Sequence, residues 1–315
     1  MIPVIILGTR NTGSSAVLDY LRGRNDVFDP LGGQEFCIIQ QRQGLSSLHR
    51  SLSVEIHPDD AMYAVIKFAQ LAKRLGADSK KLRIPPKLGH GYSSRIPGYN
   101  AAISEFLKNI TACSFGTYPL TDYLNFTTFD WLRIKGGRLP RSKNIVRNKP
   151  VPVPADEFLR CAQLLIARLF YQGHENQPEL SALVFDQAGS FWSPLSSTQY
   201  FGENRRVIGV TRDPCDVYAS LRSKKAISGS AEEFAQYQRA LKAHIANAEW
   251  SDKRMLLVRY EDFVLDHERE RDRICAHLGI DHVVPSTYDP KLSRKFVGRH
   301  KGYLTQQEIE VIRQI

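Results

Sequence analysis

The residues best suited to phosphate chemistry stand near the start of the chain, in Gly8-Thr-Arg-Asn-Thr-Gly13-Ser14-Ser15. An apolar run precedes them and an amphipathic segment follows, which predicts a strand, a turn and a helix. Backbone N–H groups at such a helix start point at an anion, and Gly13 permits close approach. The spacing is that of a nucleoside triphosphatase loop, but Ser14 replaces the lysine that ATP or GTP hydrolysis requires. The alternative is a glycine turn followed by a serine helix cap.

A second group of polar residues lies in Val210-Thr-Arg212-Asp-Pro-Cys-Asp216-Val-Tyr-Ala-Ser220. Arg212 follows a buried strand directly, where open α/β sheets bind ligands. Ser220 lies about two turns along the next helix and can share an anion with Arg212. Asp216 falls in the first turn, where a carboxylate favours the helix dipole. Alternatively, Arg212 belongs to a surface ion pair.

The elements that must position these residues form an alternating pattern. Short apolar runs rich in β-branched residues predict buried parallel strands, and amphipathic segments between them predict helices. The pattern favours an α/β fold: a P-loop-like, three-layer arrangement with a central parallel sheet flanked by helices. We predict one domain over residues 1–315, with strands at 4–7, 182–185, 207–210 and 255–258 and helices at 14–24, 154–171, 216–225, 231–250 and 269–278.

Residues 40–150 interrupt this pattern and predict a large insert that is mostly helical or irregular. Helices are expected at 57–75 and 101–110, with a loop at 76–100. The stretch from Arg133 to Lys149 contains seven basic residues and no acidic one. Because inserts beside an α/β sheet often contact substrate, we expect this one to form the acceptor side. The alternative is a solvated loop.

Composition limits the class of protein. The 315 residues are 42% hydrophobic and 24% charged, which excludes a disordered chain, and no apolar run reaches the ~20 residues of a membrane-spanning helix. The start of the chain has no basic region typical of a signal peptide, so we expect a cytoplasmic protein. Five scattered cysteines give no metal-binding spacing. The net charge of +10 favours anionic partners, and the alternative is a solvated basic surface.

Taken in order, these motifs resemble the sulfotransferases that use 3′-phosphoadenosine-5′-phosphosulfate (PAPS). The turn Thr12-Gly-Ser-Ser15 is similar to the family's 5′-phosphosulfate loop, and the run from Val210 to Leu221 is similar to its 3′-phosphate motif. Val258-Arg-Tyr-Glu-Asp-Phe263 and Gly298-Arg-His-Lys-Gly-Tyr303 resemble its later segments. The resemblance implies PAPS as donor, adenosine 3′,5′-bisphosphate as product, no metal, and donor contacts from Arg10, Asn11, Thr12, Gly13, Ser14, Ser15, Arg212, Ser220, Arg299, Lys301 and Gly302.

The sequence departs from the family pattern in the residues that would do chemistry. The family places lysine or arginine where Asn11 stands, so either Arg10 reaches the sulfuryl group or another residue has taken the role. Phe185-Asp-Gln-Ala188 lacks a lysine common there, and no catalytic histidine pattern is present. Glu35 resembles the catalytic glutamate of some bacterial members. We expect Gly32-Gly33 to let its segment return to the sheet edge and the apolar Phe36-Cys37 to bury the carboxylate in part. The alternative is a solvent-exposed carboxylate. His90 is a weaker candidate for the base.

The implied reaction moves a sulfuryl group to a hydroxyl or amine acceptor. The basic stretch favours an anionic carbohydrate, with lipids and small alcohols as alternatives. Its partners would be a nucleotide donor and a small-molecule or saccharide acceptor, with no nucleic acid. Two alternatives are a P-loop small-molecule kinase with an altered loop and a non-catalytic nucleotide- or polyanion-binding protein of the same fold. The sequence predicts no oligomeric state.

Overall fold

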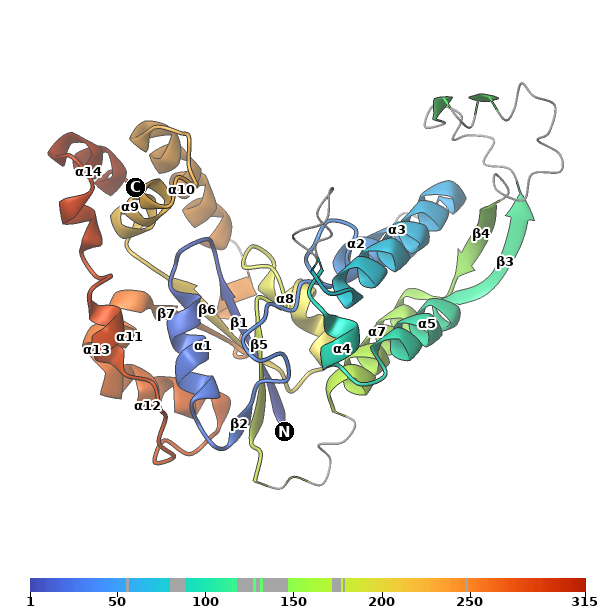
Figure 1. The fold of residues 1–315 in the computed structure, drawn as a ribbon, viewed down its shortest axis with the longest axis horizontal. Helices are drawn as coiled ribbons and strands as arrows, with labels where there is room; N and C mark the ends of the chain where they lie inside the picture. Colours follow the sequence, from blue (N-terminus) through green and yellow to red (C-terminus); the bar gives the residue numbers. More distant parts are fainter. Residues whose placement is uncertain are drawn as a thin grey trace. The chain divides into compact units, whose positions relative to one another are not determined.

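A computed structural model of the chain describes residues 1–54, 57–79, 89–117, 127–128, 131–132, 147–171, 177, 179–246 and 249–315. It divides into two compact units (Figure 1). The first unit comprises Met1–Cys37 and Gly173–Ile315, and the second comprises Ile38–Gln172. The second unit begins within two residues of the start of the insert predicted at residues 40–150 but extends 22 residues beyond its predicted end. That this insert forms the acceptor side stays a prediction.

The first unit contains a five-stranded parallel sheet with the strand order β2-β5-β1-β6-β7. All four predicted strands are present in it. The strands are β1 (Ile2–Gly8), β2 (Val27–Phe28), β5 (Ala182–Asp186), β6 (Arg206–Thr211) and β7 (Met255–Arg259). The helices are α1 (Ser14–Arg22), α8 (Pro194–Thr198), α9 (Pro214–Ser223), α10 (Ala231–Ala246), α11 (Tyr260–Leu265), α12 (His267–Leu278), α13 (Pro290–Arg294) and α14 (Gln306–Arg313), with 3₁₀ turns η3 (Gln199–Phe201), η4 (Glu249–Ser251) and η5 (Arg299–Gly302).

Strand β1 is central, with β5 on one side and β6 on the other. Ile6 is in register with Asp186 of β5 and with Ile208 of β6. The chain therefore continues to opposite sides of β1, which makes the carboxyl end of β1 a topological switch point. A crevice forms at such a point because the flanking connections diverge, so the loop after β1 is a ligand-binding position by topology alone.

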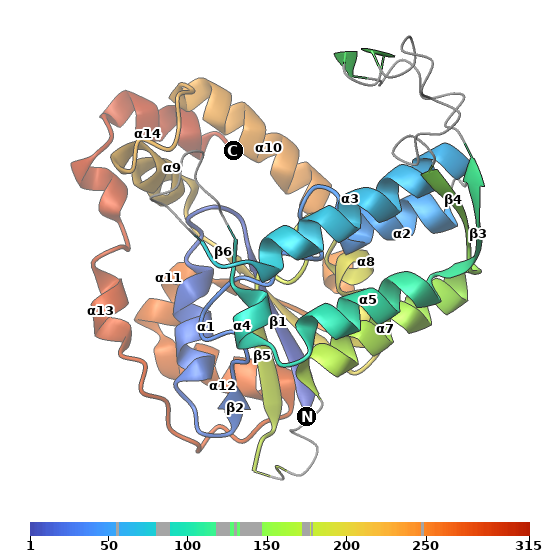
Figure 2. The same ribbon diagram turned by 45° about the vertical axis from the view of Figure 1, so that its right-hand side comes forward.

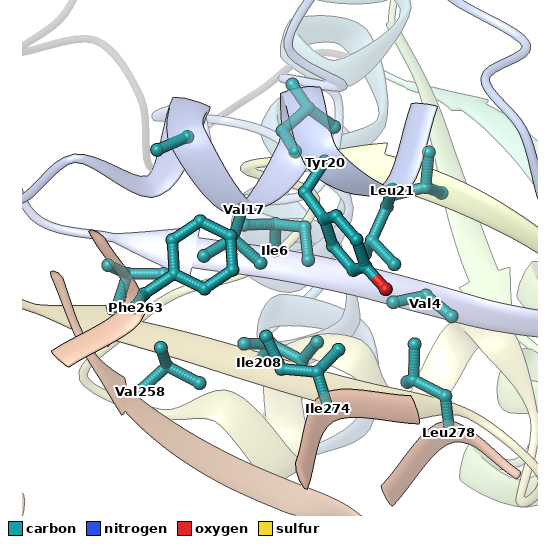
Figure 3. Packing of buried hydrophobic residues seen from close by; sticks show 14 of the residues in the cluster. Val4, Ile6, Val17, Tyr20, Leu21, Ile208, Val258, Phe263, Ile274 and Leu278 are labelled. Carbon is teal, nitrogen blue, oxygen red and sulfur yellow. The ribbon is translucent and has the colours of Figure 1, made fainter. Parts of the chain in front are cut away.

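Alternate residues of the strands pack on opposite faces of the sheet, as the period of two requires. Val4, Ile6 and Ile208 face a buried cluster with residues of α1, α11 and α12 (Figure 3). On the other face, the ring of Phe185 lies 4.9 Å from that of Phe201 and 6.3 Å from that of Phe36. Both faces of the sheet are thus covered, and the predicted three-layer α/β fold is confirmed.

The second unit packs helices against a two-stranded antiparallel sheet of β3 and β4 (Figures 1 and 2). The helices predicted at 57–75, 101–110 and 154–171 are present within a residue or two of those bounds. The β3–β4 pair lies in a region predicted to be helical or irregular. The elements are α2 (Leu45–Ser53), α3 (Pro58–Gly76), α4 (Tyr92–Arg95), α5 (Tyr99–Asn109), β3 (Thr111–Thr117), β4 (Arg147–Pro152) and α7 (Ala155–Phe170).

Helix boundaries follow local capping chemistry more closely than hydrophobic periodicity. The helix predicted at 216–225 is α9, which begins earlier because Asp213 caps it by accepting the Cys215 N–H at 2.7 Å. Pro214 occupies the first helical position, where its missing N–H has no cost. The helix predicted at 231–250 is described only to Ala246. None of the described helices is both long enough and apolar enough to span a membrane.

A buried ion pair fixes the turn that follows α1. The side chain of Arg24 is fully buried and binds both carboxylate oxygens of Asp26, at 2.9 and 2.8 Å. Its remaining N–H groups donate to Tyr20 Oη at 3.1 Å and to the carbonyl oxygens of Asp281 and Val284. The guanidinium thereby joins the end of α1 to a segment about 260 residues away.

We expect Arg24→Ala to lower the free energy of unfolding by about 3–5 kcal/mol, because it leaves the Asp26 carboxylate buried without a partner. The control is Arg271→Ala, whose side chain is 32% exposed and lies 2.8 Å from the exposed Asp272. A surface pair of this kind contributes about 0–1 kcal/mol. Denaturant unfolding of the two variants measures both values, and equal losses would contradict the role of Arg24.

Candidate functional site

The loop between β1 and α1 has the backbone that a phosphate site needs. Gly13 has a φ of 85° and occupies the N-cap position of α1, where no side chain caps the helix. A Cβ atom at this position would lie 2.3 Å from Cδ2 of Tyr260, so only glycine fits. The first N–H groups of α1 therefore face the position of a ligand, and the helix dipole favours an anion there.

Neighbouring residues hold this loop rigid. Thr12 is buried, and both its N–H and its hydroxyl donate to the Thr9 carbonyl, at 3.2 and 2.8 Å. Gln187, just after β5, accepts the Gly8 N–H at 3.3 Å and donates to Ser14 Oγ at 3.1 Å. Gln187 belongs to the segment 185–188, which lacks the lysine common in the family. Its side-chain amide thus links the loop to the end of β5.

The structure brings Arg212 and Ser220 together, as the sequence predicted. Arg212 Nη1 lies 3.3 Å from Ser220 Oγ and donates to the Asn11 carbonyl at 3.1 Å. Its Nη2 donates to the Phe296 carbonyl, and its guanidinium lies 4.9 Å from the centre of the Tyr260 ring. The side chain is 5% exposed, and among the described residues its Nε has no hydrogen-bond partner. A buried cation with an unused donor is suited to an anionic ligand.

The loop, Arg212 and Ser220 line one cavity of about 500 Å³. Its described lining contains four basic residues and one acidic residue, Asp19, so it favours a polyanion. The loop contributes Asn11, Gly13 and Ser15 to this lining, whereas its Thr12 lines a different cavity. The four basic residues are Arg212, Lys224, Lys295 and Arg299.

Several residues predicted at the donor site are not part of this lining. Arg10 is exposed on the loop, and Lys301 and Gly302 are exposed in η5. Ser14 lies beside the lining and accepts from Gln187. Lys224 was missed by the sequence analysis, although its spacing of four residues from Ser220 predicts the same face of α9.

Asp216 does more than complement a helix dipole. It is 1% exposed and accepts the Gly298 N–H at 2.8 Å, the His300 N–H at 2.9 Å and the His300 ring Nδ1 at 2.7 Å. It also lies 3.9 Å from Arg212 Nη2. One carboxylate therefore ties the first turn of α9 to the segment that carries Arg299.

Two acidic residues from distant parts of the sequence, one at the end of β5 and one in an isolated bridge, pair at the carboxyl edge of the sheet. Glu35 forms a parallel bridge with Asp186, and the Phe36 N–H donates to the Asp186 carbonyl at 2.9 Å. The predicted return of this segment to the sheet edge is confirmed, and the turn before it uses Gly32 and Gly33 at positive φ. The partial burial expected for Glu35 is wrong: its side chain is exposed, and the partly buried carboxyl is that of Asp186.

Burial, followed by the nearby charge of Glu35, raises the pKa of Asp186 to about 7. Among the described residues, its Oδ1 is buried without a hydrogen-bond partner. Asp186 therefore holds a proton in a pH range where exposed carboxyl groups have lost theirs. No pattern in the sequence marked it as unusual.

His90 belongs to the second unit, where its N–H donates to the Leu75 carbonyl and its ring lies 5.5 Å from that of Tyr92. Its role as a base stays a prediction. Of the seven basic residues between Arg133 and Lys149, the first five lie outside the described residues. In the described part of the chain, no three His, Cys, Asp or Glu side chains are arranged to hold a metal ion.

We expect Asp186→Asn to change how stability depends on pH. Between about pH 4 and pH 7 the unfolded chain loses the Asp186 proton while the folded chain keeps it, so the wild-type protein loses stability as pH rises. A shift from 3.8 to about 7 sets an upper limit of about 4 kcal/mol on this loss. The free energy of unfolding of the variant minus that of wild type should therefore be larger at pH 8 than at pH 4. Denaturant unfolding at both pH values measures this, with the exposed Asp272→Asn as control; a constant difference would contradict it.

Comparison with known proteins gives one family. Residues 138–284 match the model described as "Sulfotransferase family", a range that includes Arg212, Ser220 and Lys224 but not the phosphate loop. The structure is similar to the sulfotransferase domain of the Synechococcus PCC 7002 olefin synthase, with 13% identity, a TM-score of 0.46, and 100% of this chain and 94% of that chain covered. It is also similar to a sulfotransferase from Alicyclobacillus acidocaldarius, with 12% identity, a TM-score of 0.35, and 99% and 96% covered.

A search of curated proteins gives no significant match. The two structural similarities are weak, so the assignment depends on the family model. On that match, residues 138–284, slightly less than half of the chain, are similar to the sulfotransferase family.

Proposed function

We propose that this protein transfers a sulfuryl group from PAPS to a hydroxyl or amine of an acceptor. The observation that supports this most is the cavity of about 500 Å³ in which the start of α1 and the Arg212–Ser220 pair lie together. PAPS has two anionic groups on one nucleoside, and this cavity has two separate groups of anion-binding donors. The match of residues 138–284 to the sulfotransferase family model is consistent with this donor.

The two ends of the cavity suit different phosphates. Arg212 and Ser220 would hold the 3′-phosphate, since a guanidinium and a hydroxyl both donate to phosphate oxygens. The N–H groups of Gly13, Ser14 and Ser15 would hold the 5′-phosphosulfate at the positive end of α1. ATP lacks the 3′-phosphate, so the Arg212–Ser220 pair discriminates against it.

The proposed reaction is an in-line displacement at sulfur. The acceptor oxygen or nitrogen forms a bond to sulfur while the bond from sulfur to the bridging oxygen breaks. The bridging oxygen keeps the electron pair and becomes part of the 5′-phosphate of adenosine 3′,5′-bisphosphate. Preorganised N–H donors stabilise that developing charge. Glu35, at the same edge of the sheet, would accept the proton of the acceptor.

The charge pattern favours an anionic saccharide as the acceptor, because the stretch from Arg133 to Lys149 contains seven basic residues and no acidic one. A non-catalytic nucleotide-binding protein is the second candidate. The observation that favours it is Asn11, a neutral residue where the sulfotransferase loop places a cation. A kinase is disfavoured by Ser14 in place of the loop lysine.

A thermal-shift comparison tests the donor. Adenosine 3′,5′-bisphosphate should raise the melting temperature, and ATP with magnesium should not. The reverse result would replace the sulfotransferase proposal with the kinase. Transfer of labelled sulfate from PAPS to a panel of hydroxyl and amine acceptors then distinguishes an enzyme from a binding protein.

We expect Arg212→Ala and Ser220→Ala each to weaken binding of adenosine 3′,5′-bisphosphate by about 1–3 kcal/mol, the usual cost of losing one hydrogen bond to a charged group. The matched controls lie on α9 outside the cavity: Arg222→Ala and Ser223→Ala. Isothermal titration calorimetry gives the affinities. Folded Arg212 and Ser220 variants with wild-type affinity would remove the 3′-phosphate assignment.

We expect Glu35→Gln to lower turnover by about 10²-fold, the usual contribution of a general base, while nucleotide affinity stays unchanged. The control is Glu310→Gln, an exposed glutamate on α14. Turnover with a known acceptor is compared with calorimetric affinity for the bisphosphate. Near wild-type turnover would exclude Glu35 as the base.

A further inference from the structure

Lys224 supplies a cation to the phosphate loop from a different element. It follows α9 directly, and its Nζ lies 2.7 Å from Oδ1 of Asn11. Lys224 and Asn11 both line the cavity of about 500 Å³, together with Gly13 and Ser15. The loop position that is neutral in sequence is therefore in direct contact with an ammonium group in the folded chain.

The backbone of Asn11 explains how one residue holds this cation. Its φ of 61° lies in the left-handed region, which asparagine tolerates better than lysine or arginine. In this conformation its carbonyl accepts from Arg212 at 3.1 Å while its side chain accepts from Lys224. Lysine has three N–H donors, so the bond to Asn11 leaves two for a ligand.

The other cations of the cavity have different surroundings. Arg212 bonds Ser220, and Arg299 donates to Tyr303 Oη at 3.1 Å. Lys295 Nζ lies 5.2 Å from the centre of the Phe296 ring. Among the described lining cations, Lys224 is the one that hydrogen-bonds a side chain of the loop.

We propose that Lys224 binds the 5′-phosphosulfate and stabilises the bridging oxygen as the bond to sulfur breaks, the role first expected of Arg10. This inference rests on the proposed function. In the step, the electron pair of the S–O bond passes to the bridging oxygen, and the proton of the acceptor passes to the base. Lys224 stays protonated and contributes charge, as a fixed donor does in other displacements.

The competing role for Lys224 is the 3′-phosphate, because Ser220 lies one turn earlier on α9. Nucleotides with a single phosphate separate the two roles. Adenosine 5′-monophosphate has only the phosphate next to the loop, and adenosine 3′-monophosphate has only the other one. Calorimetry with both, and with the 3′,5′-bisphosphate, measures each end of the cavity.

We expect Lys224→Gln to weaken binding of the bisphosphate and of the 5′-monophosphate about 10-fold, since it removes one charge-assisted contact. Affinity for the 3′-monophosphate should be unchanged, and Lys224→Arg should restore most of the loss. The matched control is Lys225→Gln, the next residue, which is exposed and not part of the cavity lining. Turnover with PAPS should fall more than affinity in Lys224→Gln.

Three outcomes would overturn the inference. A loss confined to the 3′-monophosphate and the bisphosphate would make Lys224 a 3′-phosphate ligand. Unchanged affinity for all three nucleotides would remove it from the site. A loss of 5′-monophosphate binding in Arg10→Ala but not in Lys224→Gln would return the role to Arg10. Failure of the wild-type protein to bind the bisphosphate would instead refute the proposed function itself.

Discussion

The carboxylate of Asp216 is the interaction on which the geometry of the site depends. It is almost fully buried, and a buried charge is stable only when hydrogen bonds replace the lost water. Gly298 and His300 supply those bonds, which holds the C-terminal segment against the first turn of α9. Arg212 lies 3.9 Å from the same carboxylate. One residue thus fixes two walls of the cavity and orients the main cation between them.

Parallel pairing explains why cations gather at this place. The carboxyl ends of β1 and β6 are adjacent, and each strand is followed by the start of a helix. The residues after both strands therefore share one edge of the sheet, and the positive ends of α1 and α9 lie there too. Residues of these two connections and of the helices after them, together with Tyr260 and residues 292–299, line a cavity with four basic side chains.

The same edge of the sheet also carries acidic groups next to the loop. Gln187 bonds both Gly8 and Ser14, so the end of β5 and the phosphate loop form one hydrogen-bonded structure. Asp186 precedes Gln187 and pairs through its backbone with the segment of Glu35. Cations thus lie on one side of β1 and carboxyl groups on the other. This arrangement suits a reaction in which cations stabilise a leaving group that gains negative charge and a carboxylate accepts a proton from the acceptor.

Local patterns in the sequence were enough to predict the strands, the loop between β1 and α1 and the proximity of Arg212 to Ser220. Each of these depends on a local pattern: an apolar run, a glycine before a helix, or a fixed spacing along a helix. Only the fold brings Asp216 to the segment of His300, buries the Asp186 carboxyl in part and pairs β3 with β4. It also decided that Lys224 meets Asn11, 213 residues away, while Arg10 faces solvent. The reason is physical: the order of strands in the sheet sets which distant segments become neighbours, and no local pattern encodes that order.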